Sequence, residues 1–170
     1  YASIDAPEGH ALGEGDALAS LPTRTPIVFT PDGRALIVQA AANGRPQLFL
    51  RALDRPDARP IAGTEGAHVP FVSPDGKWIG FWAANELRKV PIEGGAPTTI
   101  CPMPATLGPN GASWGADDVI VFGDDATSRL MKVGTSGGTP SPVGAAPDAP
   151  NRRHVTPLVL PGGRRVMYAE

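Results

Sequence analysis

The sequence predicts an all-β protein built from repeated units of four short antiparallel strands. The 21 glycines and 20 prolines fall at regular intervals between short apolar runs, which is typical of strands joined by tight turns. The same succession of strands and turns recurs with a period of ~40–45 residues. A parallel α/β fold would need amphipathic segments of about ten or more residues between the strands, and the sequence has none.

The first 62 residues contain one expected isolated strand and one complete unit. Residues 1–24 hold the isolated strand, Ala2–Asp5, and a later segment, residues 10–20, that fits either a helical turn or an irregular loop. Residues 25–62 form the first unit, with strands expected at 26–30, 35–39, 47–51 and 58–61. Pro60 in the last of these strands predicts an outer, edge position, because proline cannot donate a ladder hydrogen bond.

The second unit, residues 63–101, is the clearest. Its first strand begins at His68, and its first two strands are joined by the turn Ser73-Pro-Asp-Gly76. Its last two strands are joined by the pair Gly94-Gly95, where glycine permits a tight turn.

The third unit, residues 110–143, repeats the second at a constant spacing of 43 residues in its later strands. The matched residues are Leu87, Val90, Gly94, Gly95, Pro97 and Ile100 with Leu130, Val133, Gly137, Gly138, Pro140 and Val143. Residues 144–153 are a proline-containing connector, and residues 154–170 supply two strands of a fourth unit.

Four-stranded units at this period predict a partial β-propeller of about three and a half blades. A single blade cannot bury both of its faces, so blades must stack on one another. An open arc would leave one blade face and one set of strand edges uncovered. The sequence therefore predicts a homodimer that closes a ring of about eight blades, in which Ala2–Asp5 of one chain completes the half blade of the other.

The repeat Ser73-Pro-Asp-Gly-Lys-Trp-Ile-Gly-Phe81 resembles the WD40-like, TolB-type PD40 propeller repeat. Together with 63–76, 87–97 and Gly111-Ala-Ser-Trp-Gly115, it is similar to the propeller that follows many bacterial Ser/Thr protein kinases of the eukaryotic type. The resemblance implies a ligand- or protein-binding sensor module of a larger bacterial protein. A periplasmic or other extracytoplasmic location is compatible with this resemblance. Family members carry about six blades, and no kinase motif is present.

Composition excludes several partners. The net charge of −2 provides no electrostatic surface for nucleic acid or an anionic membrane. No run approaches the ~18 apolar residues of a membrane span, so no membrane insertion is expected. The single cysteine, Cys101, excludes an internal disulfide and a cysteine-based zinc site, and it is expected to be a small buried apolar residue.

Most chemistry-bearing residues have a structural interpretation. Asp32 and Asp75 follow proline in tight turns, where a short carboxylate accepts hydrogen bonds from backbone N–H groups. The acidic pairs 117–118 and 124–125 fit solvated turns. The three tryptophans, Trp78, Trp82 and Trp114, are expected to pack between blades.

The histidines are the candidate site. His68 and His154 each precede or begin the first strand of a blade, and first strands line the central channel of a propeller; His10 lies in the loop after the N-terminal strand. Imidazoles at the channel mouth would bind a ligand or hold a divalent transition metal such as zinc. Hydrogen bonding of these histidines to the backbone at blade starts is the competing interpretation.

Two function classes follow. The first is a non-enzymatic binding or scaffold propeller, with the channel mouth as the site for a small molecule or a protein. The alternative is a metal-dependent hydrolase of esterase, lactonase or phosphotriesterase type, in which His68, His154 and His10 hold the metal. The sequence names no catalytic residue and no ligand.

Overall fold

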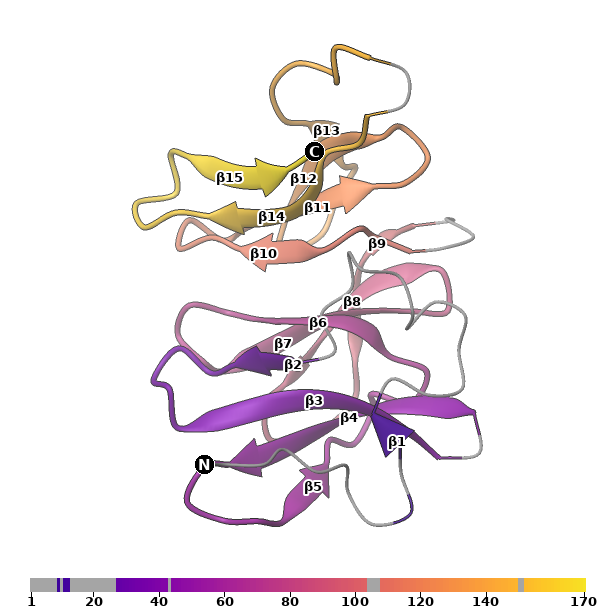
Figure 1. The fold of residues 1–170 in the computed structure, drawn as a ribbon, viewed down its shortest axis with the longest axis vertical. Coiled ribbons are helices and arrows are strands. Elements are labelled where there is room, and N and C mark those ends of the chain that lie inside the picture. Colours follow the sequence, from indigo (N-terminus) through magenta and orange to yellow (C-terminus); the bar gives the residue numbers. More distant parts are fainter. Residues whose placement is uncertain (1–8, 10, 13–26, 43, 104–107, 150–151) are drawn as a thin grey trace.

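The computed structural model describes residue 9 and residues 11–12, 27–42, 44–103, 108–149 and 152–170 (Figure 1). The expected strand at Ala2–Asp5 and the candidate His10 lie outside the described residues. Within the described ranges, no helix has the length and hydrophobicity that a membrane span requires.

The structure is a row of antiparallel sheets stacked in chain order along the long axis of the molecule (Figure 1). The first sheet contains β1 (Ala11–Leu12), β2 (Ile27–Phe29), β3 (Ala35–Ala42), β4 (Arg45–Ala52) and β5 (Ala58–Pro60). The second contains β6 (His68–Val72), β7 (Trp78–Ala83), β8 (Glu86–Pro91) and β9 (Thr98–Pro102). The third contains β10 (Ala112–Trp114), β11 (Val119–Asp124), β12 (Arg129–Gly134) and β13 (Ser141–Pro142), and the fourth contains β14 (Val155–Val159) and β15 (Val166–Ala169).

The all-β fold class is confirmed: three blades of four strands, the first with β1 as an additional strand, are followed by two strands of a fourth. Pro60 lies on the outermost strand of its blade, as predicted, because β5 pairs only with β4. One local difference concerns Ala11–Leu12, which pairs with Ala40–Ala41 on β3 as a short strand that the sequence did not predict. The rest of the segment 10–20, apart from these two residues, lies outside the described residues.

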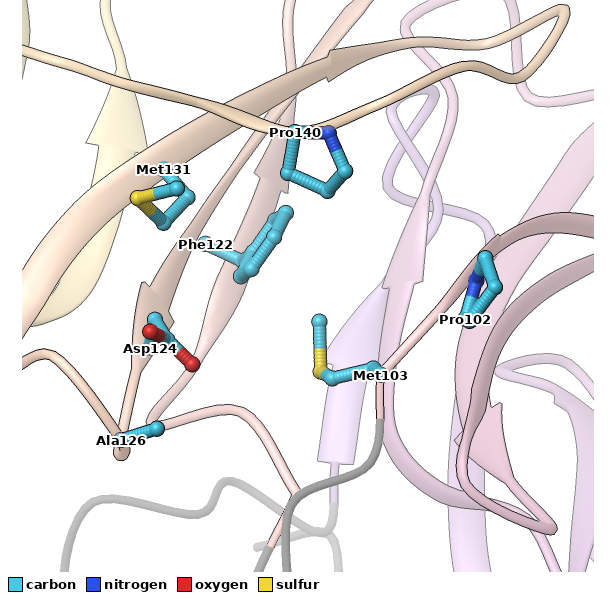
Figure 2. A pocket seen from close by; sticks show the side chains of 7 residues that line it. All are labelled: Pro102, Met103, Phe122, Asp124, Ala126, Met131 and Pro140. Carbon is cyan, nitrogen blue, oxygen red and sulfur yellow. The ribbon is translucent and has the colours of Figure 1, made fainter.

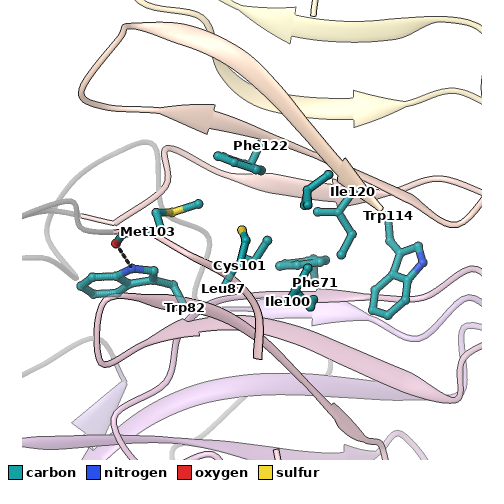
Figure 3. Packing of buried hydrophobic residues seen from close by; sticks show 10 residues of the cluster. Phe71, Trp82, Leu87, Ile100, Cys101, Met103, Trp114, Ile120 and Phe122 are labelled. Atoms are coloured by element: carbon teal, nitrogen blue, oxygen red, sulfur yellow. Dashed lines mark hydrogen bonds between the residues drawn. The ribbon is translucent and has the colours of Figure 1, made fainter. Parts of the chain in front are cut away.

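Two apolar interfaces hold the blades together. Between blades 1 and 2, the side chains of Ile37, Leu48, Ile79, Phe81 and Val90 form one buried cluster. Between blades 2 and 3, a second buried cluster includes Phe71, Trp82, Leu87, Cys101, Trp114 and Phe122 (Figure 3). Trp78 packs against the second cluster, so the prediction that the three tryptophans pack between blades is confirmed.

Strand alternation produces this division of the core. On β7, Ile79 and Phe81 belong to the cluster shared with blade 1, whereas Trp82 belongs to the cluster shared with blade 3. Successive side chains of a strand point to opposite faces, so one central strand supplies both interfaces. Blade 2 is thus buried on both faces, by blade 1 on one side and by blade 3 on the other.

The two ends of the row differ. On β3, Ile37 and Gln39 face blade 2, so Leu36, Val38 and Ala40 lie on the opposite face of the sheet. These three residues are nevertheless at most 2% exposed. The expectation of an uncovered apolar face on blade 1 is therefore wrong for these residues. At the other end β15 pairs only with β14 among the described strands, and its Met167 is 57% exposed.

Candidate functional site

The first strands of the blades, β2, β6, β10 and β14, lie beside one another in that order. A cavity of about 590 Å³ opens there, lined by the C-terminal parts of these strands and by the turns that follow them. Its wall is largely apolar and includes Val28, Phe29, Phe71, Val72, Trp114, Leu158 and Val159. This central cavity occupies the place of the channel of a propeller.

Two large side chains of the wall remain open to solvent. Phe29 on β2 is 60% exposed and Leu158 on β14 is 50% exposed. Between them, Phe71 and Trp114 lie with ring centroids 6.1 Å apart and are almost fully buried. Exposed large apolar side chains gathered in a concavity indicate a binding surface.

The turns at this end of the first strands are held by carboxylates. Asp75 Oδ1 accepts hydrogen bonds from Ser73 Oγ (2.6 Å) and from Lys77 N (3.1 Å), and both bonds lower the pKa of Asp75. Ser73 Oγ also accepts a hydrogen bond from Trp78 N (2.9 Å). The structural interpretation of Asp75 is confirmed. The hydroxyl group of Ser73 both donates and accepts a hydrogen bond within the same turn.

The equivalent turn of blade 1 repeats this arrangement. Asp32 Oδ1 accepts hydrogen bonds from Thr30 Oγ1 (2.6 Å) and Arg34 N (3.0 Å). Both bonds lower the pKa of the Asp32 carboxyl. Two of the turns that line the central cavity are therefore held by hydrogen bonds to ionised carboxylates.

His68 and His154 lie at the opposite ends of their strands from the central cavity. His68 begins β6, is buried, and has its Nδ1 3.4 Å from Gln39 Nε2 on blade 1. Its ring also lies 5.7 Å from the Trp82 ring, centroid to centroid. His68 therefore contacts the second strands of blades 1 and 2.

His154 directly precedes β14 and is also buried. Its Nε2 is 3.0 Å from Glu170 Oε1, and its ring lies 4.4 Å from that of Tyr168. Arg152 Nη1 donates to Glu170 Oε2 (2.6 Å), and this bond is the main reason that the pKa of Glu170 is lowered.

The two histidines contact different residues, and no described contact joins them. Among the residues that the structure describes, no three His, Cys, Asp or Glu side chains are grouped so that they could hold a metal ion. His154 Nδ1 is buried without a hydrogen-bond partner in the same part of the chain.

Asn110 is a residue that the sequence reasoning missed. It is 6% exposed, directly precedes Gly111 and β10, and donates from Nδ2 to Asp125 Oδ1 (3.2 Å). Arg153 pairs with the same carboxylate, so Asp125 is part of an ion pair and does not lie in a merely solvated turn. Asn110 N, in addition, donates to Gly123 O (2.8 Å).

Backbone conformation identifies Asn110 as the counterpart of His68. The residue after each has a left-handed backbone: Val69 has φ 51° and Gly111 has φ 83°. Thr156, which follows Val155, has φ 47° and stands at the same place in the half blade. No residue type marks this position in the sequence, because it holds valine, glycine and threonine in the three blades.

Cys101 behaves as predicted. Its side chain is 1% exposed within the cluster between blades 2 and 3. Burial raises the pKa of the thiol to about 11. Cys101 is therefore a packing residue.

No protein-family model and no curated protein matches this sequence. Solved structures do match. They include TolB from Acinetobacter baumannii (TM-score 0.68, 16% identity, 86% of this chain and 37% of that chain) and the calcium-binding protein regucalcin from Agrobacterium tumefaciens (TM-score 0.61, 16% identity, 88% and 54%). Virginiamycin B lyase from Staphylococcus aureus also matches (TM-score 0.60, 18% identity, 86% and 48%).

At these identities the likeness concerns the fold alone. The chain spans about half or less of the length of these three structures. Proteins with different functions share this architecture, so function must be argued from the site. The chain forms part of a β-propeller, with a fold like that of TolB.

Proposed function

We propose that this chain is a non-enzymatic binding module whose site is the central cavity lined by the first strands of the blades. The observation that carries the proposal is the apolar wall contributed by all four first strands, with Phe29 and Leu158 open to solvent. The cavity, about 590 Å³, is within the range of ligand sites. Its occupant is an apolar ligand or an apolar segment of a protein.

The buried histidines have a supporting role in this proposal. His68 and His154 are at most 6% exposed, so they offer little surface to a ligand. We propose that they shape the other end of the channel through Gln39 and Glu170. The module would then present an apolar mouth and a polar mouth.

The experiment uses Trp114, which lines the cavity, as a fluorescent reporter. Replacing Trp78 and Trp82 with phenylalanine leaves Trp114 as the only tryptophan of the chain. The neutral apolar dye N-phenyl-1-naphthylamine should quench its emission by energy transfer when it occupies the cavity. Thermal unfolding of this reporter variant checks that the fold is kept.

Leu158→Asp and Phe29→Asp in the reporter background should weaken dye binding about tenfold or more, because each places a charge in the apolar wall. Leu53→Asp is the matched control, since Leu53 is 49% exposed and does not line the cavity. Equal effects of Leu53→Asp and Leu158→Asp would contradict the proposal. So would a dye that binds without changing Trp114 emission.

We also propose that the open strand β15 is completed by a second copy of this chain. β15 has one described partner strand, and its Met167 and Tyr168 are 57% and 45% exposed. Unpaired edges with apolar side chains pair readily with another strand. Light scattering should give twice the 17.6 kDa of one chain, and Met167→Lys should shift the mass to one chain. A monomer at every concentration would disprove the homodimer.

The sensor interpretation is a third part of the proposal. The motif from Ser73 to Phe81 forms the turn between β6 and β7 and most of β7. Its resemblance to the propellers that follow bacterial Ser/Thr protein kinases supports a module within a larger sensor protein. In such a protein, occupation of the central cavity would report the presence of the ligand. The test of this part uses a protein in which this module is joined to a kinase domain. Its kinase activity should depend on the ligand, and Leu158→Asp should remove that dependence.

A further inference from the structure

A second cavity, of about 300 Å³, lies between blades 2 and 3 (Figure 2). It is bounded by the end of β9, by β11 and β12, and by the segment before β13. No residue lines both this cavity and the central one. It is therefore a separate site, which we call the methionine cavity.

The wall of the methionine cavity is soft and apolar. Phe122 lies between Met131 and Met103 in the close view, and two prolines and an alanine complete the wall (Figure 2). Thioethers are polarizable and adapt their shape, so methionine-lined surfaces accept varied apolar groups. An aromatic ring among them offers a face to a cation.

One charged group borders this apolar wall, the half-buried carboxylate of Asp124. Its Oδ2 accepts hydrogen bonds from Thr127 N (3.1 Å) and Thr127 Oγ1 (2.6 Å). Arg129, the cross-strand partner of Asp124, turns away and donates from Nη2 to Gly144 O (3.0 Å). Across the described ranges, no Lys, Arg or His side chain forms an ion pair with Asp124.

We propose that the methionine cavity binds a small organic ammonium ion, with an apolar body against Phe122 and the methionines and its charged nitrogen at Asp124. A half-buried carboxylate without a counter-ion favours a cation beside it. The face of the Phe122 ring and the two methionine thioethers favour a ligand with an apolar or aromatic body. The ring face also attracts the ligand's positive charge. An anionic ligand would be repelled by Asp124 in the same place.

Three probes of similar size separate these contributions: phenethylamine as the ammonium, 2-phenylethanol as the neutral analogue and phenylacetate as the anion. The readout is the NMR spectrum of protein labelled with [methyl-¹³C]methionine, in which the three methionines give three signals. Phenethylamine should shift Met103 and Met131, which line the cavity. Met167, exposed on β15, is the internal control.

We expect phenethylamine to bind about tenfold more tightly than 2-phenylethanol, and phenylacetate to bind more weakly than both. Asp124→Asn should remove the advantage of the amine and leave the alcohol unchanged. Asp118→Asn is the matched control, because it removes the same charge at the other end of β11 and should change nothing.

Equal affinities for the three probes in the unaltered protein would overturn the proposal, and so would shifts that include Met167 to the same extent. The comparison of probes does not depend on any substitution. It therefore remains decisive if Asp124→Asn fails to fold.

Discussion

Phe71 on β6 and Gly80 on β7 are cross-strand partners, and the Phe71 ring fills the space that a side chain on Gly80 would need. A Cβ added to Gly80 would lie 2.1 Å from Phe71 Cε2. The glycine lets the ring lie flat on the sheet beside Trp114. This pair therefore helps to shape both the core between blades 2 and 3 and the wall of the central cavity.

Gly80→Ala should lower the free energy of unfolding by about 1–3 kcal/mol, because the added methyl group overpacks a filled core. Urea unfolding measures the change. Gly134→Ala is the control, since a Cβ there would meet nothing closer than 3.8 Å, and it should change stability by no more than about 0.5 kcal/mol. Phe71→Leu should partly rescue Gly80→Ala. Equal losses in the two alanine variants would show that Phe71 does not fill this space.

A second prediction concerns Thr156, whose left-handed backbone is strained for a β-branched residue. Because its side chain is exposed, Thr156→Asn should relieve strain without loss of packing and stabilise the protein by about 0.5–1 kcal/mol. Thr98→Asn is the matched control: Thr98 is also exposed but has no positive φ, so no gain is expected. Thermal unfolding of both variants is the measurement, and an equal shift for both would contradict the assignment of strain.

The counterpart Gly111 should respond in the opposite direction. A Cβ there would lie 2.8 Å from Thr156 Cα, and φ is 83°. Gly111→Ala should therefore lower the free energy of unfolding by more than about 1 kcal/mol, through both strain and overpacking. The same unfolding measurement applies. A neutral Gly111→Ala would mean that blades 3 and 4 are not in contact here.

A third prediction follows from the lowered pKa values of Asp32 and Asp75. A carboxyl whose pKa is lower in the folded state stabilises the protein above its unfolded value of about 3.9, and this contribution disappears as the pH falls through the folded value. Asp75→Asn should therefore reduce stability at pH 7, with the difference shrinking below about pH 4. Urea unfolding across pH 2–7 tests it.

Additivity is the control for this acid dependence. Asp32→Asn should behave like Asp75→Asn, because the two turns have equivalent hydrogen bonds. A double variant whose effect differs from the sum would show that the two turns interact, since Pro31 lies beside Gly76. A difference that stays constant down to about pH 2 would assign the effect to shape and not to charge.

The blade pattern was predictable because its signals are local. Leu87 and Leu130 lie 43 residues apart on β8 and β12, and the glycines that follow them, Gly94 and Gly137, both have positive φ. A turn that needs a left-handed residue favours glycine at that position, so the repeat can be recognised from the spacing of its glycines. The two-residue strand Ala11–Leu12 offers no such signal.

The match of Asn110 with His68 was hidden by unequal turns. Two residues join β7 to β8, whereas four join β11 to β12, so the spacing of 43 does not extend to the first strands. Their position directly before a left-handed residue, and not their residue type, relates the two. Only the backbone shows that relation.

The two cavities were not predictable for a different reason. Phe29 and Leu158 read as ordinary strand residues, because each lies in a short strand beside other apolar residues. Which face is open to solvent depends on how the blades are arranged. The same holds for Asp124: its cross-strand partner Arg129 donates to Gly144 O, and no ion pair with Asp124 is found among the described residues.

The last prediction concerns Cys101, whose thiol pKa is raised to about 11 by burial. Thiolate is the reactive form, so at pH 8 native protein should react with a disulfide reagent at least about a hundredfold more slowly than an exposed cysteine of ordinary pKa. The rate should rise to the ordinary value in denaturing urea. Cys101→Ser should destabilise the protein more than Cys101→Ala, because serine adds a buried hydroxyl to an apolar cluster. Rapid labelling of the native protein would contradict the burial of Cys101 between blades 2 and 3.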